Sequence, residues 1–461
     1  MKIVVLNGSP KGDISVTIQY INYIQKKFKQ HDLKIIHISQ RINQIEKNKE
    51  AFKDIISYVK SSDGIIWAFP LYVFTVHSNY QRFIELIFER NVEDAFKAKY
   101  TSILATSIHF YDHTAINYMN SICDDLNMNY VDYFSPHMYD LKKEDIRKNL
   151  LKFAQNFFDA IENKKITLKN YTPIKYSPIK YIPEIIYDKI DVSNKKVIIV
   201  TDSFENINLE NMIVKFRNSF SQTIELVNLN DINIRGSCLG CLKCGYNYEC
   251  AYSGKDDFIS FYNSKLKTAD IIVFAGNIKY RHLSYAWKRF FDRGFFNTHT
   301  PSLSGKQIGF IISGALSQIP NLKQILTAYT EWQGSNLAGF LTDEYDTSIE
   351  IDKQLHAFSY NLIKLSTINY RKPATFLGVA GMKIFRDEIW GEIRFPFIAD
   401  HKAYKALKVY DFPQKNYKSR IMNFLLTLMI KFPPIRRELY SNKMKSKMIE
   451  SLKKIVEDET I

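Results

Sequence analysis

Asp63-Gly-Ile-Ile-Trp-Ala-Phe-Pro70 is an apolar run introduced by an aspartate, and it recurs 207 residues later as Asp270-Ile-Ile-Val-Phe-Ala-Gly-Asn277. At the same offset, Arg82-Phe-Ile-Glu85 corresponds to Arg289-Phe-Phe-Asp292. Self-similarity over a fixed distance indicates an internal repeat. The chain therefore contains two copies of one structural unit.

The copies begin with matching runs, Lys2-Ile-Val-Val-Leu-Asn-Gly-Ser9 and Lys196-Val-Ile-Ile-Val-Thr-Asp-Ser203, at an offset of 194. Because this offset is smaller than 207, the second copy carries a net thirteen extra residues before its third run. That interval contains Cys238–Cys250, a segment of thirteen residues. We therefore regard the cysteine segment as the main insertion in the second copy.

Short apolar runs alternate with helix-like segments in both copies. Near-continuous β-branched runs are typical of parallel strands that helices cover on both faces. Each copy is therefore predicted to form a doubly wound α/β domain with a five-stranded parallel sheet. The expected strands are 3–6, 34–38, 64–69, 102–106, 130–134, 197–200, 223–229, 271–275, 308–313 and 338–341.

The repeat divides the 461 residues into four parts. We predict domains at 1–168 and 195–370, joined by a linker at 169–194 that contains three prolines. Residues 371–461 fall outside the repeat and are predicted to form a mainly helical, basic extension. It holds 19 Lys and Arg against 10 Asp and Glu, in a chain whose net charge is +15.

The positive net charge is compatible with binding to nucleic acid, to an anionic membrane or to an acidic partner, and it does not distinguish between them. Within the extension, the apolar run Ile421–Phe432 favours a packed helix, while peripheral contact with an anionic bilayer stays open. Aromatic residues interleave with basic ones there, as in some single-strand binders, but such interleaving usually reflects core packing. Nucleic-acid binding is therefore disfavoured.

Five cysteines in 461 residues exclude a disulfide scaffold. No stretch reaches the about 18 uninterrupted apolar residues of a membrane span. The first residues lack the apolar length and cleavage site of a signal peptide. We therefore expect a cytoplasmic protein.

A loop of small and hydroxyl residues, Asn7-Gly-Ser-Pro-Lys-Gly-Asp-Ile-Ser-Val-Thr17, follows the first strand. Small residues let the backbone approach a phosphate, and hydroxyl groups and helix amides donate hydrogen bonds to it. Lys11 adds positive charge. The loop predicts a phosphate site, with a capped turn as the alternative. Its counterpart in the second copy contains Asp202 and Glu205, which would repel a phosphate.

The third strand ends in Phe69-Pro-Leu-Tyr-Val-Phe74. Together, the Gly-Ser-Pro-Lys…Ser-x-Thr and Pro-x-Tyr patterns resemble the flavodoxin-like NADPH-dependent FMN reductase family. The resemblance implies two tandem flavodoxin-like domains, FMN as cofactor and NAD(P)H as electron donor, and no catalytic side chain is predicted. It assigns the FMN phosphate to Ser9, Lys11, Ser15, Val16 and Thr17, and the border of the flavin ring to Pro70, Leu71, Tyr72 and Val73. The loop after the fourth strand, 107–113, would close the flavin site.

Four cysteines, Cys238, Cys241, Cys244 and Cys250, have the spacing C-x2-C-x2-C-x5-C. Thiolates this close in sequence favour an iron–sulfur cluster, with zinc and no metal as alternatives. A cysteine segment with this spacing, which follows the second strand of such a domain in the sequence, resembles that of the iron–sulfur flavoproteins. These are oligomers in which the cluster of one subunit approaches the FMN of another. The resemblance implies a [4Fe–4S] cluster and an internal pseudo-dimer of the two domains, and a homo-oligomer stays open.

The favoured function is an electron-transfer flavoprotein that passes electrons between NAD(P)H or a ferredoxin and an unidentified acceptor. The first alternative is an NAD(P)H-dependent reductase of FMN, quinones or nitro compounds that has no cluster. The second is a non-enzymatic module that binds nucleic acid or membrane through its basic extension.

Overall fold

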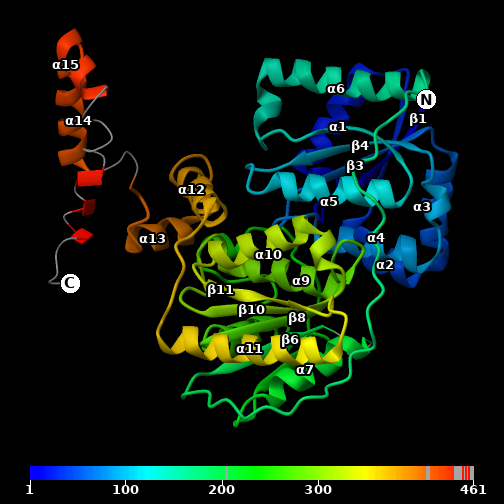
Figure 1. Cartoon of the computed structure of the whole chain (residues 1–461). Helices are drawn as coiled ribbons and strands as arrows, with labels where there is room; N and C mark the ends of the chain where they lie inside the picture. Colours follow the sequence, from blue (N-terminus) through cyan, green and yellow to red (C-terminus); the bar gives the residue numbers. More distant parts are fainter. Residues whose placement is uncertain (203–205, 412–415, 441–448, 451, 454, 457–461) are drawn as a thin grey trace. The chain divides into compact units, whose positions relative to one another are not determined.

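A computed structural model covers the chain and describes residues 1–202, 206–411, 416–440, 449–450, 452–453 and 455–456 (Figure 1). The chain forms two compact units, Met1–Ala403 and Tyr404–Ile461. Both sheets belong to the first unit.

The first sheet has five parallel strands in the order β2-β1-β3-β4-β5. Every strand expected in the first copy is confirmed, with ends that differ by at most two residues. The central strands are buried along almost their whole length, which explains their continuous apolar sequence. The strands are β1 (Lys2–Asn7), β2 (Asp32–His37), β3 (Gly64–Pro70), β4 (Tyr100–Thr106) and β5 (Asn129–Phe134).

Helices cover both faces of this sheet. The apolar residues of α1 and α6 pack on one face, and those of α2 to α5 pack on the other. Asn48 shows how one helix begins: its side chain accepts hydrogen bonds from the Glu50 and Ala51 amides of α3 (2.9 and 3.2 Å). The helices are α1 (Val16–Lys27), α2 (Ile42–Lys47), α3 (Lys49–Ser61), α4 (Ser78–Glu89), α5 (Asp112–Asp125) and α6 (Glu144–Glu162).

The second sheet repeats the parallel order as β7-β6-β8-β10-β11. Its five predicted strands are confirmed as β6 (Val197–Thr201), β7 (Glu225–Asn228), β8 (Ile271–Lys279), β10 (Gln307–Ser313) and β11 (Asn336–Thr342). The helices are α7 (Ile207–Asn218), α8 (Phe258–Phe261), α9 (Tyr285–Gly294), α10 (Pro320–Trp332) and α11 (Ser348–Thr367). The two copies thus share one strand order.

The prediction of five strands is wrong for the second sheet, which has six. The additional strand, β9 (His282–Leu283), pairs antiparallel with the extended end of β8. Tyr280 and Arg281 form the turn with φ of 47° and 65°. Two left-handed residues are the requirement of a tight hairpin, and Asn-Gly usually supplies them. Tyr-Arg gives no such signal in the sequence.

The two halves meet through α4 and α9, which occupy equivalent places in the two copies. The Ser78 amide donates to Asp292 Oδ2 (2.7 Å), and the Tyr285 amide donates to Glu85 Oε1 (2.5 Å). Ser78 and Tyr285 are 207 residues apart in the sequence, and so are Glu85 and Asp292. The same contact is therefore made twice, in opposite directions, as at the interface of a two-fold symmetric dimer.

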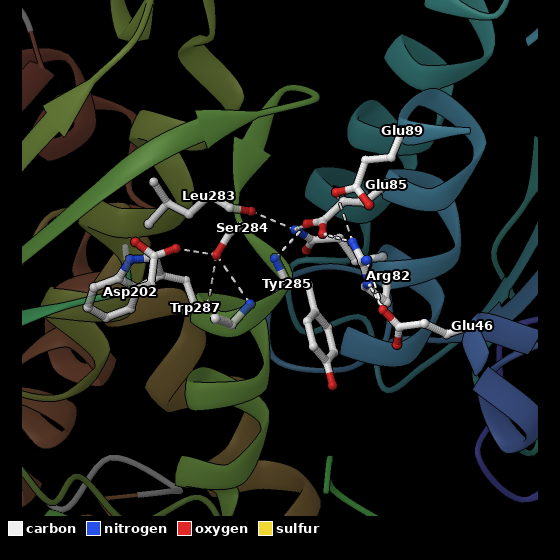
Figure 2. Close-up of polar contacts among 11 residues, drawn as sticks. Glu46, Arg82, Glu85, Glu89, Asp202, Leu283, Ser284, Tyr285 and Trp287 are labelled. Carbon is white, nitrogen blue, oxygen red and sulfur yellow. Dashed lines mark hydrogen bonds and ion pairs between the residues drawn. The ribbon is translucent and has the colours of Figure 1, made fainter. Parts of the chain in front are cut away.

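Figure 2 shows the half of this interface that surrounds Glu85. Gln81 Nε2 donates to the Leu283 carbonyl oxygen (2.5 Å), and Arg82 Nη1 donates to Glu85 Oε2 (3.0 Å). Burial raises the pKa of Glu85 to about 6, although Arg82 acts in the opposite direction. These hydrogen bonds and ion pairs around Glu85 therefore hold the two halves in one relative position.

The linker runs along the second half without regular structure from 165 to 189. Tyr181 is fully buried, and its hydroxyl group donates to Asp352 Oδ1 (2.6 Å). Its amide donates to Asn208 Oδ1 at the start of α7 (2.9 Å). The segment is thus extended, and Tyr181 holds it against the second half.

Beyond the second sheet, the first unit includes α12 (Phe376–Trp390) and the start of α13 (Ile398–Ala406). The second unit contains α14 (Tyr417–Met429) and α15 (Pro433–Glu438). The side chains of α14 are exposed, and the expectation that this segment packs against the sheets, which belong to the first unit, stays a prediction. Among the described helices, none has the length and hydropathy needed to cross a membrane.

Candidate flavin site and cysteine loop

The carboxyl ends of β1, β3 and β4 meet at one edge of the first sheet, where open parallel sheets bind ligands. A cavity of about 270 Å³ lies there, close to the roughly 300–1,000 Å³ typical of small-molecule sites. It brings together all but one of the residues predicted for FMN, namely Ser9, Lys11, Ser15, Val16, Pro70, Leu71, Tyr72 and Val73.

Ser15 carries a buried hydroxyl group at the start of α1. It is the N-cap residue, but its side chain does not cap the helix. Its Oγ has no hydrogen-bond partner among the described residues, and Ser15 is only 1% exposed. The first amides of any helix also lack an intrahelical acceptor. With Lys11 beside them, these donors fit a phosphate group.

Hydrogen bonds within the first loop hold this arrangement. The Ser9 amide donates to Asn7 Oδ1 (2.9 Å), and the Lys11 amide donates to Ser9 Oγ (3.2 Å). Asn7 Nδ2 donates to the carbonyl oxygen of Gly12 (3.3 Å). The loop is therefore shaped before a ligand arrives, which reduces the entropy lost on binding.

Thr17 is the predicted residue that does not line the cavity. It is fully buried, and its Oγ1 forms a hydrogen bond of 2.6 Å with Thr106 Oγ1 at the end of β4. The side chain of Thr17 thus joins α1 to the sheet. Only its backbone amide, in the first turn of α1, is available for the predicted phosphate contact.

The loops after β3 and β4 also line the cavity. Tyr72 and Thr75 exchange backbone hydrogen bonds of 2.9 and 2.8 Å, which fix the first of these loops. Burial raises the pKa of Tyr72 well above its ordinary value, so the phenol stays neutral. From the second loop, Ser107, Ile108 and Phe110 reach the cavity, as the sequence predicted for 107–113.

The rest of the wall comes from residues that sequence analysis missed. Trp332, at the end of α10, is 6% exposed, and its Nε1 has no acceptor in the described part of the chain. The cavity is therefore lined by a second buried donor in addition to Ser15. The other such residues are Phe295, His299, Phe385, Ile393, Pro396 and Phe397. They lie in the second half and the extension, and no local pattern marked them.

The four cysteines of the predicted cluster converge on one small cavity of about 20 Å³. Burial raises the pKa of Cys238 and of Cys244 to about 12 in each case, so these thiols are protonated at neutral pH. Cys241 is exposed and Cys250 is half-buried. A cation bound here would have to displace protons.

The cysteines are not placed around a single metal ion. In the described ranges, no three His, Cys, Asp or Glu side chains form a group that could hold one ion. A mononuclear zinc site needs such a group, whereas each cysteine of an iron–sulfur cluster binds a different iron and the sulfurs stay further apart. Since the cavity is small, the loop would have to open to admit a cluster.

Arg293 of α9 holds both ends of the cysteine loop. Its Nη1 donates to the Gly236 carbonyl oxygen (2.9 Å), and its guanidinium group forms two bonds with Asp256 (2.7 and 3.0 Å). It also lies over the ring of Tyr252, 4.3 Å from the centroid. Arg293 lines the cysteine cavity, and its buried Nε lacks an acceptor among the described residues. A cationic donor here fits an anionic group bound to the thiols.

The flavin and cysteine cavities share a wall made by Cys238, Gly240, Leu242 and Phe295. Two contacts fix the cysteine loop against α4 of the first half. His77 Nε2 lies 2.8 Å from the Cys238 carbonyl oxygen, and Ser237 Oγ donates to Asn79 Oδ1 (2.6 Å). The loop of one half therefore closes the cavity of the other.

Gly240→Ala is expected to weaken binding of the predicted FMN at least about tenfold. Gly240 has a φ of +61°, and a Cβ there would lie 2.2 Å from Tyr72 Oη and 3.1 Å from Lys11 Cε. Both side chains would be displaced in the cavity. Fluorescence titration of the apoprotein with FMN measures the change.

Gly254→Ala is the matched control. Gly254 has a similar φ of +71°, but no atom lies within 4 Å of its added Cβ. Both variants bear a left-handed alanine, which costs about 1–2 kcal/mol, and only Gly240→Ala meets Tyr72. Equal FMN affinities in the two variants would contradict the placement of Gly240 in the cavity wall.

The equivalent edge of the second half has a different arrangement. Asp202 is buried and hydrogen-bonded to the Ser284 hydroxyl group, and burial raises its pKa. The predicted repulsive partner, Glu205, lies outside the described residues. The linker occupies this edge, where Tyr176 Oη lies 3.4 Å from Ser313 Oγ at the end of β10. At this edge, the linker and the buried Asp202 thus take the place of the first loop's Ser9 and Lys11.

Solved structures resemble parts of the chain at low sequence identity. One is an NADH:FMN oxidoreductase in its apo form, with 17% identity, 34% of this chain and 87% of that chain covered, and a TM-score of 0.29. A flavoenzyme NAD(P)H:(acceptor) oxidoreductase from Paracoccus denitrificans has 15% identity, coverages of 35% and 97%, and a TM-score of 0.30. General stress protein 14 from Treponema denticola, in complex with FMN, has 10% identity, coverages of 36% and 99%, and a TM-score of 0.26.

No curated protein matches the chain. The family comparison concerns the first half, whose loops carry the predicted phosphate and ring contacts. Residues 1–135 match the model of the NADPH-dependent FMN reductase family, which confirms for this part of the chain the resemblance found in its sequence.

Proposed function

We propose that the protein is an FMN-dependent oxidoreductase that takes electrons from NAD(P)H. The observation that carries this proposal is the cavity at the carboxyl edge of the first sheet, which gathers Ser9, Lys11, Ser15 and Val16 of the first loop and helix with Leu71–Val73 of the loop after β3. The family match of residues 1–135 supports the same cofactor.

The residues present fit FMN. Ser15 Oγ, the first amides of α1 and Lys11 would hold the phosphate, and Pro70–Val73 would border the ring. Trp332 Nε1 supplies a further buried donor without a partner in the described residues. When bound, FMN accepts a hydride and releases electrons singly or in pairs. The chain binds and orients it, and the aromatic wall excludes water.

We further propose that the cysteine loop holds an iron–sulfur cluster that exchanges electrons with the flavin. Three features support it: four thiols on one cavity, the unpaired Nε of Arg293 within the described residues, and the wall shared by the two cavities. Electrons would then cross only the layer formed by Cys238, Gly240 and Leu242. The alternative is a flavin-only reductase of FMN, quinones or nitro compounds.

The shared strand order and the reciprocal contacts of α4 and α9 support a tandem duplication that forms an internal pseudo-dimer. The first half would supply the flavin site and the second half the thiols. A ferredoxin could serve as donor in place of NAD(P)H, because the net charge of +15 would attract an acidic partner.

Protein purified without oxygen is expected to contain FMN, iron and acid-labile sulfide. Cys241→Ala should lose iron and sulfide and keep FMN, since Cys241 does not line the flavin cavity. Cys123→Ala is the control, because Cys123 is buried in the core of the first half. Metal analysis, sulfide determination and absorption spectra measure all three components.

Each outcome distinguishes one part of the proposal. Protein that contains FMN but no iron would leave the flavin-only reductase. Protein that contains neither would contradict both sites. Loss of FMN together with iron in Cys241→Ala, but not in Cys123→Ala, would show that the cysteine loop is needed to close the flavin cavity.

A further inference from the structure

The helix α14 presents an apolar surface that none of the described residues of its own unit covers. All thirteen of its residues are exposed. The exposed fractions of Ile421, Phe424 and Leu425 are 61%, 64% and 50%. Soluble proteins rarely leave contiguous apolar surface of this kind without a binding function. The neighbouring side chains Phe432 and Ile435 are exposed as well.

The residues of α14 are segregated around the helix axis. With about 3.6 residues per turn, Ser419, Asn423 and Thr427 recur every four residues along one narrow side. Most of the remaining surface is apolar and includes Ile421, Met422, Phe424, Leu425, Leu428 and Met429. A wide apolar face beside a narrow polar one is typical of helices that lie in a membrane interface.

Charge indicates which surface would complement this helix. Between residues 415 and 456 the sequence has 11 Lys and Arg against 2 Glu. Lys418 precedes the apolar stretch, and Lys431, Arg436 and Arg437 follow it. Basic residues next to an apolar face favour anionic lipid headgroups, whereas a protein partner would need its own acidic rim.

The length of α14 excludes a spanning helix. Thirteen residues extend for about 20 Å, against a hydrocarbon core of about 30 Å. Pro433 and Pro434 then begin α15, so the chain turns into a new helix after Phe432. The helix can lie on a bilayer but is too short to cross it.

We propose that α14 and its flanking basic residues bind the surface of an anionic bilayer and make the protein a peripheral membrane protein. The apolar face would enter the boundary between headgroups and acyl chains, and the lysines and arginines would contact the headgroups. This proposal is independent of the flavin and cysteine sites.

The test uses the full chain and vesicles of phosphatidylcholine, with and without phosphatidylserine, in a sedimentation assay. We expect binding to vesicles that contain phosphatidylserine, weaker binding at high salt, and little binding to phosphatidylcholine alone. The double variant Phe424→Glu/Leu428→Glu should lower the bound fraction at least about tenfold, because it places two charges on the apolar face.

Asn423→Glu/Thr427→Glu is the matched control, since it adds the same charge on the polar side of the same helix. It should reduce binding much less than the apolar-face variant. Equal losses in the two variants would show a purely electrostatic effect and overturn the proposal. So would absence of binding to any vesicle, or a dimer in solution that only the apolar-face variant dissociates, because a second copy would then cover α14.

Discussion

Ser15→Asp is expected to expel FMN from the protein. The new carboxylate would lie where the hydroxyl group of Ser15 has no partner among the described residues, at the end of the cavity assigned to the phosphate. Like charges about 4 Å apart repel by about 4 kcal/mol at an effective dielectric constant near 20. We therefore expect FMN affinity to fall by roughly two to three orders of magnitude.

Ser15→Asn separates the effect of charge from that of size. Asp and Asn have nearly the same volume, and both are favoured at a helix N-cap, as Ser is. Either variant should therefore leave α1 and the fold intact, which circular dichroism and thermal unfolding can verify. Only Ser15→Asp adds a negative charge.

Fluorescence titration of the apoproteins with FMN gives the decisive comparison. Ser15→Asn should bind FMN with modestly reduced affinity and Ser15→Asp should bind it hardly at all. If the two variants bound FMN equally well, the phosphate would not lie at Ser15, and the first loop would be a structural turn.

The convergence of the first-loop residues on one cavity could be predicted because it is local, and their assignment to a phosphate stays a prediction. Ser9, Lys11 and Ser15 lie within seven residues, and one strand–loop–helix unit places all three. Thr17 shows the limit of this reasoning. The sequence identifies its hydroxyl group as a candidate for the phosphate, but only the structure shows that this group is hydrogen-bonded to Thr106 at the end of β4.

The opposite wall could not be predicted, because distant segments build it. Trp332, Phe385 and Phe397 reach the cavity from more than 250 residues beyond the phosphate loop. In the sequence each is an ordinary aromatic residue of an apolar segment. Its placement depends on how the second half and α12 pack against the first half, and no local periodicity encodes that.

The strands of both sheets were the most predictable feature, because burial on both faces imposes continuous apolar runs. The hairpin of β8 and β9 escaped prediction, because tertiary contacts hold its turn. Arg281 makes two bonds of 2.6 Å with Asp125 of the first half and a third, also of 2.6 Å, with the Thr172 carbonyl oxygen. The interface thus stabilises a turn that Tyr280 and Arg281 would not favour alone.

Lys288→Met is expected to destabilise the first unit by about 3–5 kcal/mol, the usual effect of leaving one partner of a buried ion pair uncompensated. Lys288 and Asp292 form an ion pair within α9, with side chains 1% and 0% exposed. Burial lowers the pKa of Lys288, and Asp292 opposes that shift. Without the ammonium group, the Asp292 carboxylate would remain buried without its cation.

Loss of the Lys288–Asp292 pair would also affect the first half, because both residues contact it. Asp292 Oδ2 also accepts the Ser78 amide of α4 (2.7 Å), and Lys288 Nζ donates to the Tyr72 carbonyl oxygen in the loop that borders the flavin cavity (3.4 Å). The equivalent residue of the first half is Gln81, which is neutral. The first half therefore has no cation at the position that corresponds to Lys288, and the ammonium group next to Tyr72 has no symmetric counterpart.

Thermal unfolding should show a melting temperature roughly 5 °C lower for Lys288→Met, because a unit of this size shifts by only about 1 °C per kcal/mol. The double variant Lys288→Met/Asp292→Asn should recover much of this loss, because it removes the uncompensated charge and keeps an acceptor for the Ser78 amide. Lys53→Met is the control, since its pair with Glu50 is exposed and its loss should leave the melting temperature unchanged. If the double variant were no more stable than Lys288→Met, the loss of stability would come from packing and not from an uncompensated charge. That result would contradict the role of the Lys288–Asp292 ion pair in holding the two halves together.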